Sequence, residues 1–206
     1  MRPPFVLPES VTSFSDYFRL NADTDQVLGA LGYALTKGHA LLPRTAAVPA
    51  WVPLLQANLE EMLPLMNLTS EAARREMLVA PVLTEVARQT RVPIHIEYNI
   101  TVSERLKGPL DYLLRGPRHF LVVEAKNDDT ARGFTQLAAE LVALDQWTDS
   151  DTPILYGGLT IGTLWQFATL DRAAKMMTQD IGLYRVPYDL DELASVLVGI
   201  LTEPGV

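Results

Sequence analysis

The chain of 206 residues contains no cysteine, and this absence removes several classes of chemistry at once. Without cysteine there is no disulfide framework, no thiolate metal site and no cysteine nucleophile. Histidine is scarce as well, and His39, His95 and His119 have neither the spacing of a metal site nor that of a catalytic dyad. The glycines do not form a phosphate-binding loop that ends in lysine, so nothing indicates a nucleotide-hydrolysing motor.

Long apolar runs are also missing. No stretch reaches the roughly 18 apolar residues that a membrane-spanning helix needs, and the first ten residues hold three prolines in place of the apolar core of a signal peptide. We therefore expect a cytoplasmic protein with no membrane partner. The length and the hydrophobic fraction of 48% predict one globular domain over residues 1–206.

Positive charge is in the minority, because the net charge is -8 at pH 7, and such a balance disfavours a polyanionic partner. The charge is nevertheless uneven along the chain. Residues 74–132 hold ten Lys and Arg against eight Asp and Glu, whereas residues 133–206 hold three against ten. A locally basic centre between acidic flanks is compatible with a site that binds phosphate.

Three regions follow from the hydrophobic periodicity. Residues 1–66 are predicted to form a helical N-terminal extension, 67–170 a core, and 171–206 a C-terminal helical region. The core is expected to contain a helix kinked by Pro81, three strands, a second helix and two further strands around Gly162. The elements are expected at 14–37 (two short helices), 54–62, 69–90, 94–102, 108–116, 118–126, 130–147, 153–170 (two strands) and 191–201, with a tight turn at 115–118. Three sequential strands followed by a helical crossover predict an α/β fold, a mixed sheet flanked by helices.

The third predicted core strand ends in two opposite charges, in the sequence FLVVEAK. Side chains alternate along a strand, so Glu124 and Lys126 are expected on one face together with Phe120 and Val122. Isolated charges in a buried strand are unfavourable by several kcal/mol unless they are paired or bind an ion. A simple cross-strand salt bridge is one interpretation of this pair.

Asp111 lies in the preceding strand, within GPLDYLL. If these two strands pair, Asp111 and Glu124 lie close together, and two neighbouring carboxylates repel unless one is protonated or a cation lies between them. Magnesium, a hard cation that prefers oxygen ligands, answers this requirement. Lys126 beside such an ion could assist a water molecule and stabilise negative charge on a phosphate.

The Asp, spacer, Glu-X-Lys pattern formed by GPLDYLL and FLVVEAK resembles the active-site motif of the PD-(D/E)XK, or restriction-endonuclease-like, nucleases. SEAARREMLVAPVL, RGFTQLAAEL and YGGLTIGTLWQF are similar to the nuclease domains of type I restriction motor subunits and, more closely, to small uncharacterised cyanobacterial proteins of this fold. The resemblance covers about residues 69–170 and implies a helix, three strands, helix, strand (αβββαβ) core.

The resemblance implies that Asp111 and Glu124 bind Mg²⁺ or Mn²⁺, with a contribution from the backbone carbonyl of Ala125. It also implies that Lys126 assists the attacking water, and Gln136 matches the glutamine of the family's Gln-X-X-X-Tyr helix motif. The chain departs from the family at two points: Glu140 replaces the tyrosine of that motif, and Leu110 instead of proline precedes Asp111.

Five helical residues near this motif have two interpretations each. Glu71 stands where family members carry a helix carboxylate close to the metal, but a first-turn glutamate also suits the helix dipole. Arg74, Arg75 and Arg132, like Thr130, could contact phosphates or form a solvated surface.

The sequence thus predicts a nuclease that hydrolyses DNA phosphodiesters with Mg²⁺ or Mn²⁺. A non-catalytic binding or assembly module that retains the nuclease fold is the alternative, because the chain is acidic and lacks the motif tyrosine. A homodimer and an unidentified protein partner are left open.

Overall fold

The computed structural model of the chain describes residues 5–116, 120–126 and 128–202. A mixed sheet of seven strands forms its centre, in the order β1-β7-β6-β5-β4-β3-β2. Its strands are β1 (Ala34–Gly38), β2 (Ile94–Thr101), β3 (Lys107–Arg115), β4 (Phe120–Ala125), β5 (Ile154–Thr160), β6 (Leu164–Asp171) and β7 (Met176–Arg185). The expected mixed sheet flanked by helices is confirmed.

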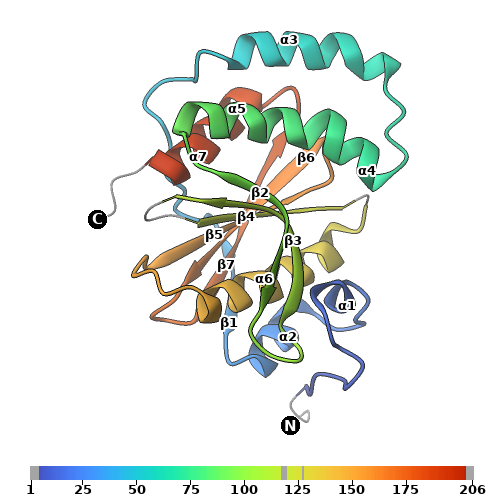
Figure 1. Cartoon of the computed structure of the whole chain (residues 1–206), viewed down its shortest axis with the longest axis vertical. Helices are drawn as coiled ribbons and strands as arrows, with labels where there is room; N and C mark the ends of the chain where they lie inside the picture. Colours follow the sequence, from blue (N-terminus) through green and yellow to red (C-terminus); the bar gives the residue numbers. More distant parts are fainter. Residues whose placement is uncertain (1–4, 117–119, 127, 203–206) are drawn as a thin grey trace.

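Helices cover both faces of this sheet (Figure 1). One face packs under α6 (Thr130–Trp147), with α1 (Phe14–Phe18) and α2 (Thr24–Ala30) outside it. The other face packs under α5 (Ala80–Thr90) and α7 (Leu190–Thr202), with α3 (Val52–Met62) beyond them. No helix within the described ranges is long and apolar enough to cross a bilayer.

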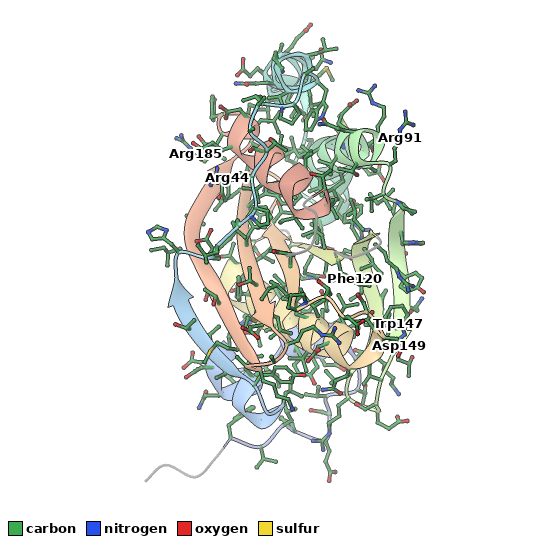
Figure 2. The ribbon with its side chains drawn as sticks, turned by 90° about the vertical axis from the view of Figure 1, so that its left-hand side faces the viewer. Arg44, Arg91, Phe120, Trp147, Asp149 and Arg185 are labelled. Atoms are coloured by element: carbon green, nitrogen blue, oxygen red, sulfur yellow. The ribbon has the colours of Figure 1, made fainter. Side chains whose placement is uncertain are left out.

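The three strands that lead to the candidate site follow the predicted order. β2, β3 and β4 pair antiparallel in sequence, and α6 then connects β4 to the parallel strand β5. The end of α6 lies beside the start of β4, because Arg115 stacks on both Phe120 and Trp147, which are labelled in Figure 2. The first turns of α6 therefore lie at the other end of β4, where the charged motif is. Residues 117–118 of the predicted turn lie outside the described residues.

Two strands were not predicted, and both lie in regions expected to be helical. The N-terminal region 1–66 contains β1, because the left-handed Gly32, at φ +84°, ends α2 before the chain extends to pair with β7. The C-terminal region 171–206 contains β7, which forms a hairpin with β6. Among the described residues of that region, 171–202, the helical element is α7. The apolar residues of β1 are too few to form a two-residue repeat, so its strand conformation depends on β7.

The helix predicted over 69–90 is present, but it is not uniform. It starts as α4 (Glu71–Arg74), widens into a π-helical segment η2 (Arg75–Val79) and continues as α5. Pro81 has no backbone N–H and crowds the carbonyl of Met77 four residues earlier. The expected irregularity at Pro81 therefore takes the form of a wider turn just before it. A short 3-10 helix, η1 (Leu63–Leu65), follows α3.

We expect Gly199→Ala to destabilise the fold by about 1–3 kcal/mol, the range for overpacking in a well-packed core. A Cβ atom at this position of α7 would lie 2.6 Å from the backbone oxygen of Pro43 and 2.8 Å from the Cα atom of Arg44. Gly29→Ala is the matched control, because nothing lies within 4 Å of a Cβ atom there and alanine favours helix. Urea unfolding should move in opposite directions for the two variants, and equal effects would contradict the packing argument.

Candidate functional site

Strand β4 brings the charged motif into the centre of the protein. The Glu124 side chain is only 1% exposed, and Lys126, directly after the strand, forms an ion pair with Glu124 Oε1. The backbone N–H of Lys126 donates to the carbonyl of Thr160 on β5, at 2.8 Å, which holds the strand end in the sheet. The predicted alternation is confirmed, because the cores on the two faces are built from Phe120 and Val122 on one side and Leu121, Val123 and Ala125 on the other.

Asp111 lies beside this motif on β3. The register pairs Tyr112 with Val123, so Asp111 stands opposite Glu124 at the end of the ladder. The backbone N–H of Ala125 donates to Asp111 Oδ2 at 2.9 Å. The sequence-based expectation that Asp111 and Glu124 are neighbours is therefore confirmed. The group of Ala125 that contacts the acid is its N–H, and a role for its carbonyl stays a prediction.

Helix α6 packs on one face of the sheet and covers the site. The Gln136 side-chain amide donates to Glu124 Oε1 at 2.7 Å and to Glu140 Oε1 at 2.9 Å. Gln136 and Glu140 are one helical turn apart, so both project from the same face of α6 towards β4. Glu140 has no exposed surface. The residue that replaces the motif tyrosine is thus part of the site.

Burial dominates the electrostatics of these acids. It raises the pKa of Glu124 to about 7, with a further contribution from the charge of Asp111, while Lys126 acts in the opposite direction. Burial and the neighbouring Glu124 raise the pKa of Glu140 well above its usual range. Desolvation lowers the pKa of Lys126, but the combined attraction of Glu124, Glu71 and Asp111 raises it above its usual value. Because Lys126 contacts Glu124 and not Glu140, we assign the proton at neutral pH to Glu140.

A proton on Glu140 also explains two buried oxygens that lack a donor among the described residues. Glu124 Oε2 and Glu140 Oε2 are both buried without a hydrogen-bond partner when both carboxyl groups are ionised. A protonated Glu140 donates to Glu124, and this bond stabilises the ionised form of Glu124. The oxygen of the Gln136 amide is a third buried acceptor with no donor in the described part of the chain.

Glu71 reaches the same site from α4. Its negative charge contributes to the raised pKa of Lys126, so it lies within electrostatic range of the ammonium group. The N-terminus of α4 is capped by Ser70, whose hydroxyl accepts from the N–H of Ala73 at 3.1 Å. Glu71 lies in the first turn of that helix. Both interpretations of Glu71, as a dipole partner and as a site residue, are compatible with this position.

The predicted phosphate-binding residues have different surroundings. Arg75 forms an ion pair with Asp111 Oδ1 at 3.4 Å, and its side chain is only 17% exposed. Arg74 donates to the carbonyl of Ile161 at 3.0 Å, and Arg132 pairs with Asp129 at 3.3 Å. Arg75 is therefore in direct contact with an acid of the site. Thr130 begins α6.

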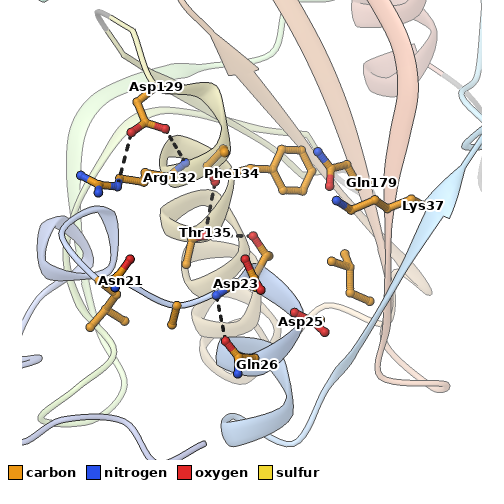
Figure 3. Close-up of a pocket in the computed structure, with 15 residues that line it drawn as sticks. Asn21, Asp23, Asp25, Gln26, Lys37, Asp129, Arg132, Phe134, Thr135 and Gln179 are labelled. Atoms are coloured by element: carbon orange, nitrogen blue, oxygen red, sulfur yellow. Dashed lines mark hydrogen bonds and ion pairs between the residues drawn. The ribbon is translucent and has the colours of Figure 1, made fainter.

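A pocket of about 800 Å³ lies on the other side of α6, between this helix, α2 and the edge of the sheet (Figure 3). Its walls carry the Asp129–Arg132 ion pair and the hydrogen bond between Thr24 and Thr135. Three acidic and two basic side chains line it, so it has no surplus of positive charge for a phosphate. The charged residues of its wall are Asp23, Asp25, Lys37, Asp129 and Arg132. None of them is among the acids described above around Glu124.

The structure therefore brings five of the predicted site residues together with two more. Of these two, one was predicted only as a possible phosphate contact, and the other was named only as the residue in place of the motif tyrosine. Comparisons with protein-family models, with curated proteins and with solved structures found no match. The chemistry of the site rests on its own geometry. Glu140 carried a signal in the sequence, its spacing of four from Gln136 on a buried helix. The pairing of Arg75 with Asp111 carried none, because it depends on how α4 packs on β3. The five are Glu71, Asp111, Glu124, Lys126 and Gln136; the two are Arg75 and Glu140.

Proposed function

We propose that the chain is a nuclease of the restriction-endonuclease-like, PD-(D/E)XK type, which hydrolyses DNA phosphodiester bonds with Mg²⁺ or Mn²⁺. The observation that carries the proposal is the convergence of Asp111, in the middle of β3, with Glu124 and Lys126 at the end of the adjacent strand β4. The order α5, β2, β3, β4, α6, β5 supports it as well, because this is the core order that the sequence resemblance implies.

The residues fit a divalent cation by charge and by donor type. Four carboxyl groups (Glu71, Asp111, Glu124 and Glu140) face two cations (Arg75 and Lys126). With the proton assigned to Glu140, three carboxylates face two cations, which leaves one negative charge. No group of three or more His, Asp or Glu side chains arranged to hold a metal occurs in the described residues. Mg²⁺ does not need one, since it is usually held by one or two carboxylates together with water and substrate phosphate.

Asp111 and Glu124 are the residues proposed to hold this cation, through carboxylate oxygens that lie on neighbouring strands. A bound Mg²⁺ or Mn²⁺ supplies an acidified water molecule and neutralises charge on the phosphate. The Lys126 ammonium is a hydrogen-bond donor for a phosphate oxygen on which charge develops. Gln136 orients Glu124 through its 2.7 Å hydrogen bond, and Glu124 in turn holds Lys126.

A binding or assembly module without turnover is the second candidate. It is favoured by one observation: both cations of the site, Lys126 and Arg75, already contact acids. In that case the cluster is a structural ion-pair network and needs no metal. A thermal-shift measurement separates the two candidates. If the cluster binds a divalent cation, Mg²⁺ raises the melting temperature of the wild type and Asp111→Asn removes this increase. A structural ion-pair network gives no such increase.

Nicking of supercoiled DNA tests the proposed function directly. We expect the wild-type chain to nick DNA in Mg²⁺ or Mn²⁺ and not in a chelator, and Asp111→Asn to lower the rate at least about tenfold, because the neutral amide holds the cation more weakly. Asp149→Asn is the matched control, an exposed acid at the far end of α6 (Figure 2). Absence of nicking by the wild type, or equal rates in all three proteins, would remove the proposal.

A further inference from the structure

Arg75 is held between two carboxylates that come from different strands. Its guanidinium lies 3.4 Å from Asp111 Oδ1 on β3 and 3.5 Å from Glu97 Oε1 on β2. It also stacks on Tyr112, at 5.2 Å from the ring centroid. The contacts with the two acids are nearly equal in length and longer than a tight charge-assisted hydrogen bond. The guanidinium group of Arg75 is thus shared between Asp111 and Glu97 and forms a short ion pair with neither.

Glu97 has an unusual backbone for this position. It lies in the middle of β2, yet its φ is +52°, in the left-handed region that residues other than glycine seldom adopt. The ladder pairs Ile96 with Tyr112 and Tyr98 with Leu110, so Glu97 stands opposite Asp111 at the one position where that stretch of pairing is interrupted. Such conformations are unfavourable, and they persist where the surrounding structure requires them.

A second backbone irregularity lies in the helix segment that carries Arg75. The π-helical segment η2 begins at Arg75, and single π-helical turns within an α-helix occur frequently at functional sites. The two acids differ in freedom. Asp111 is fixed by the N–H of Ala125, whereas the Glu97 side chain is 67% exposed and free to follow a moving partner. Arg75 can therefore shift towards Glu97 while Asp111 stays in place.

We propose that Arg75 is an exchangeable counter-ion that positions Asp111, with Glu97 as its alternative ion-pair partner. Arg75 neutralises Asp111 while the cluster holds no divalent cation, and it moves onto Glu97 when Asp111 binds one. The inference rests on the proposed function, since it takes Asp111 as a residue of the cation site. The physical reason for the movement is repulsion, because a guanidinium on Asp111 opposes a divalent cation at the same carboxylate.

A double-mutant cycle on the full chain tests this exchange, with Mn²⁺ alone as the probe in a calorimetric titration. Glu97→Gln removes the alternative ion-pair partner, so Arg75 stays paired with Asp111. The Mn²⁺ affinity then falls about fivefold, the scale of coupling between contacting residues. Arg75→Gln removes the competitor and raises the affinity by a similar factor. In the Arg75→Gln background, Glu97→Gln then changes the affinity less than about twofold.

Two controls separate exchange from general electrostatics and from strain. Glu104→Gln removes an exposed acid that pairs with Lys107 and leaves the Mn²⁺ affinity unchanged. Glu97→Gly relieves the left-handed backbone and raises the melting temperature in chelator by about 2–4 °C, while it weakens Mn²⁺ binding as Glu97→Gln does. If Arg75→Gln does not fold, Arg75→Lys carries the cycle, because lysine lacks the planar fork that contacts two carboxylates together.

The outcomes distinguish this inference from the proposed function. Wild-type protein that binds Mn²⁺ and nicks DNA, with Glu97→Gln equally effective in both backgrounds or without effect in either, overturns the exchange alone. Wild-type protein that neither binds Mn²⁺ nor nicks DNA overturns both. Non-additive effects of Arg75→Gln and Glu97→Gln, with the sign given above, support the exchange.

Discussion

Lys126→Ala is expected to lower the rate of DNA nicking by about 10²–10³-fold, the effect of removing one donor that stabilises charge developing in a transition state. The ammonium group of Lys126 is the donor in the cluster that is best placed for a phosphate oxygen, because it lies at the end of β4 beside Asp111 and Glu124. Single-turnover nicking in Mn²⁺ measures the effect on the chemical step without the contribution of product release.

The same substitution also changes stability, and the two effects need to be separated. Without Lys126, the buried Glu124 loses its ion-pair partner, and removing one partner of a buried pair is destabilising. The double variant Lys126→Ala/Glu124→Gln leaves no carboxylate to compensate, so it should recover much of the lost stability and none of the activity. Lys107→Ala is the matched lysine control, since its ammonium contacts only the exposed Glu104 among the described acids.

A rate for Lys126→Ala within a factor of about two of the wild-type rate would exclude Lys126 from the chemistry. The Glu-X-Lys pair would then be a salt bridge, the simplest interpretation of the sequence. If the double variant recovered activity together with stability, a catalytic role of Lys126 would also be excluded. The loss of activity in Lys126→Ala would then result from a disturbed fold.

The strand and helix that build the site could be predicted because each has a local cause. Two-residue alternation in FLVVEAK placed Glu124 and Lys126 on one face, and a helical repeat predicted the helix that carries Gln136. The role of Gln136 in the site came from the resemblance of its motif. The closeness of Asp111 required one further step, the pairing of two sequential strands, which short-range order favours. Each of these steps depends on neighbours in the chain.

The parts that could not be predicted depend on contacts between distant segments. The strand conformation of β1 is fixed by β7, which lies about 140 residues later, and neither strand has a clean alternation of its own. The pairing of Arg75 with Asp111 likewise requires the relative placement of α4 and β3. The left-handed backbone of Glu97 has no sequence signal, because glutamate seldom adopts it and no glycine marks the position.

The second large effect concerns pH, and its direction follows from the raised carboxyl pKa values. In a chelator, we expect stability to fall as the pH rises from about 4.5 to about 7. Folded Glu124, which is ionised above its pKa of about 7, binds a proton below that pH, where the unfolded chain has already released it. The shift corresponds to about 3 kcal/mol for Glu124 alone, at 1.4 kcal/mol per pH unit. Glu140, whose pKa is also raised, adds to the same fall. Asp16 and Asp189 have lowered pKa values and act below about pH 4, outside this window.

Glu140→Gln isolates the contribution of the proton that the folded protein holds on Glu140. Glutamine has the shape of the protonated acid and can donate to Glu124 Oε2, so this variant needs no proton uptake on folding. We expect it to match the wild type at pH 5 and to exceed it by at least about 1–2 kcal/mol at pH 8, measured by urea unfolding in chelator. Glu61→Gln, an exposed change on α3, should leave the slope unchanged. A wild-type curve that is flat between pH 5 and 8, or a Glu140→Gln protein that is less stable at pH 8, would show that Glu140 is ionised in the folded chain and that a cation other than the proton neutralises the cluster.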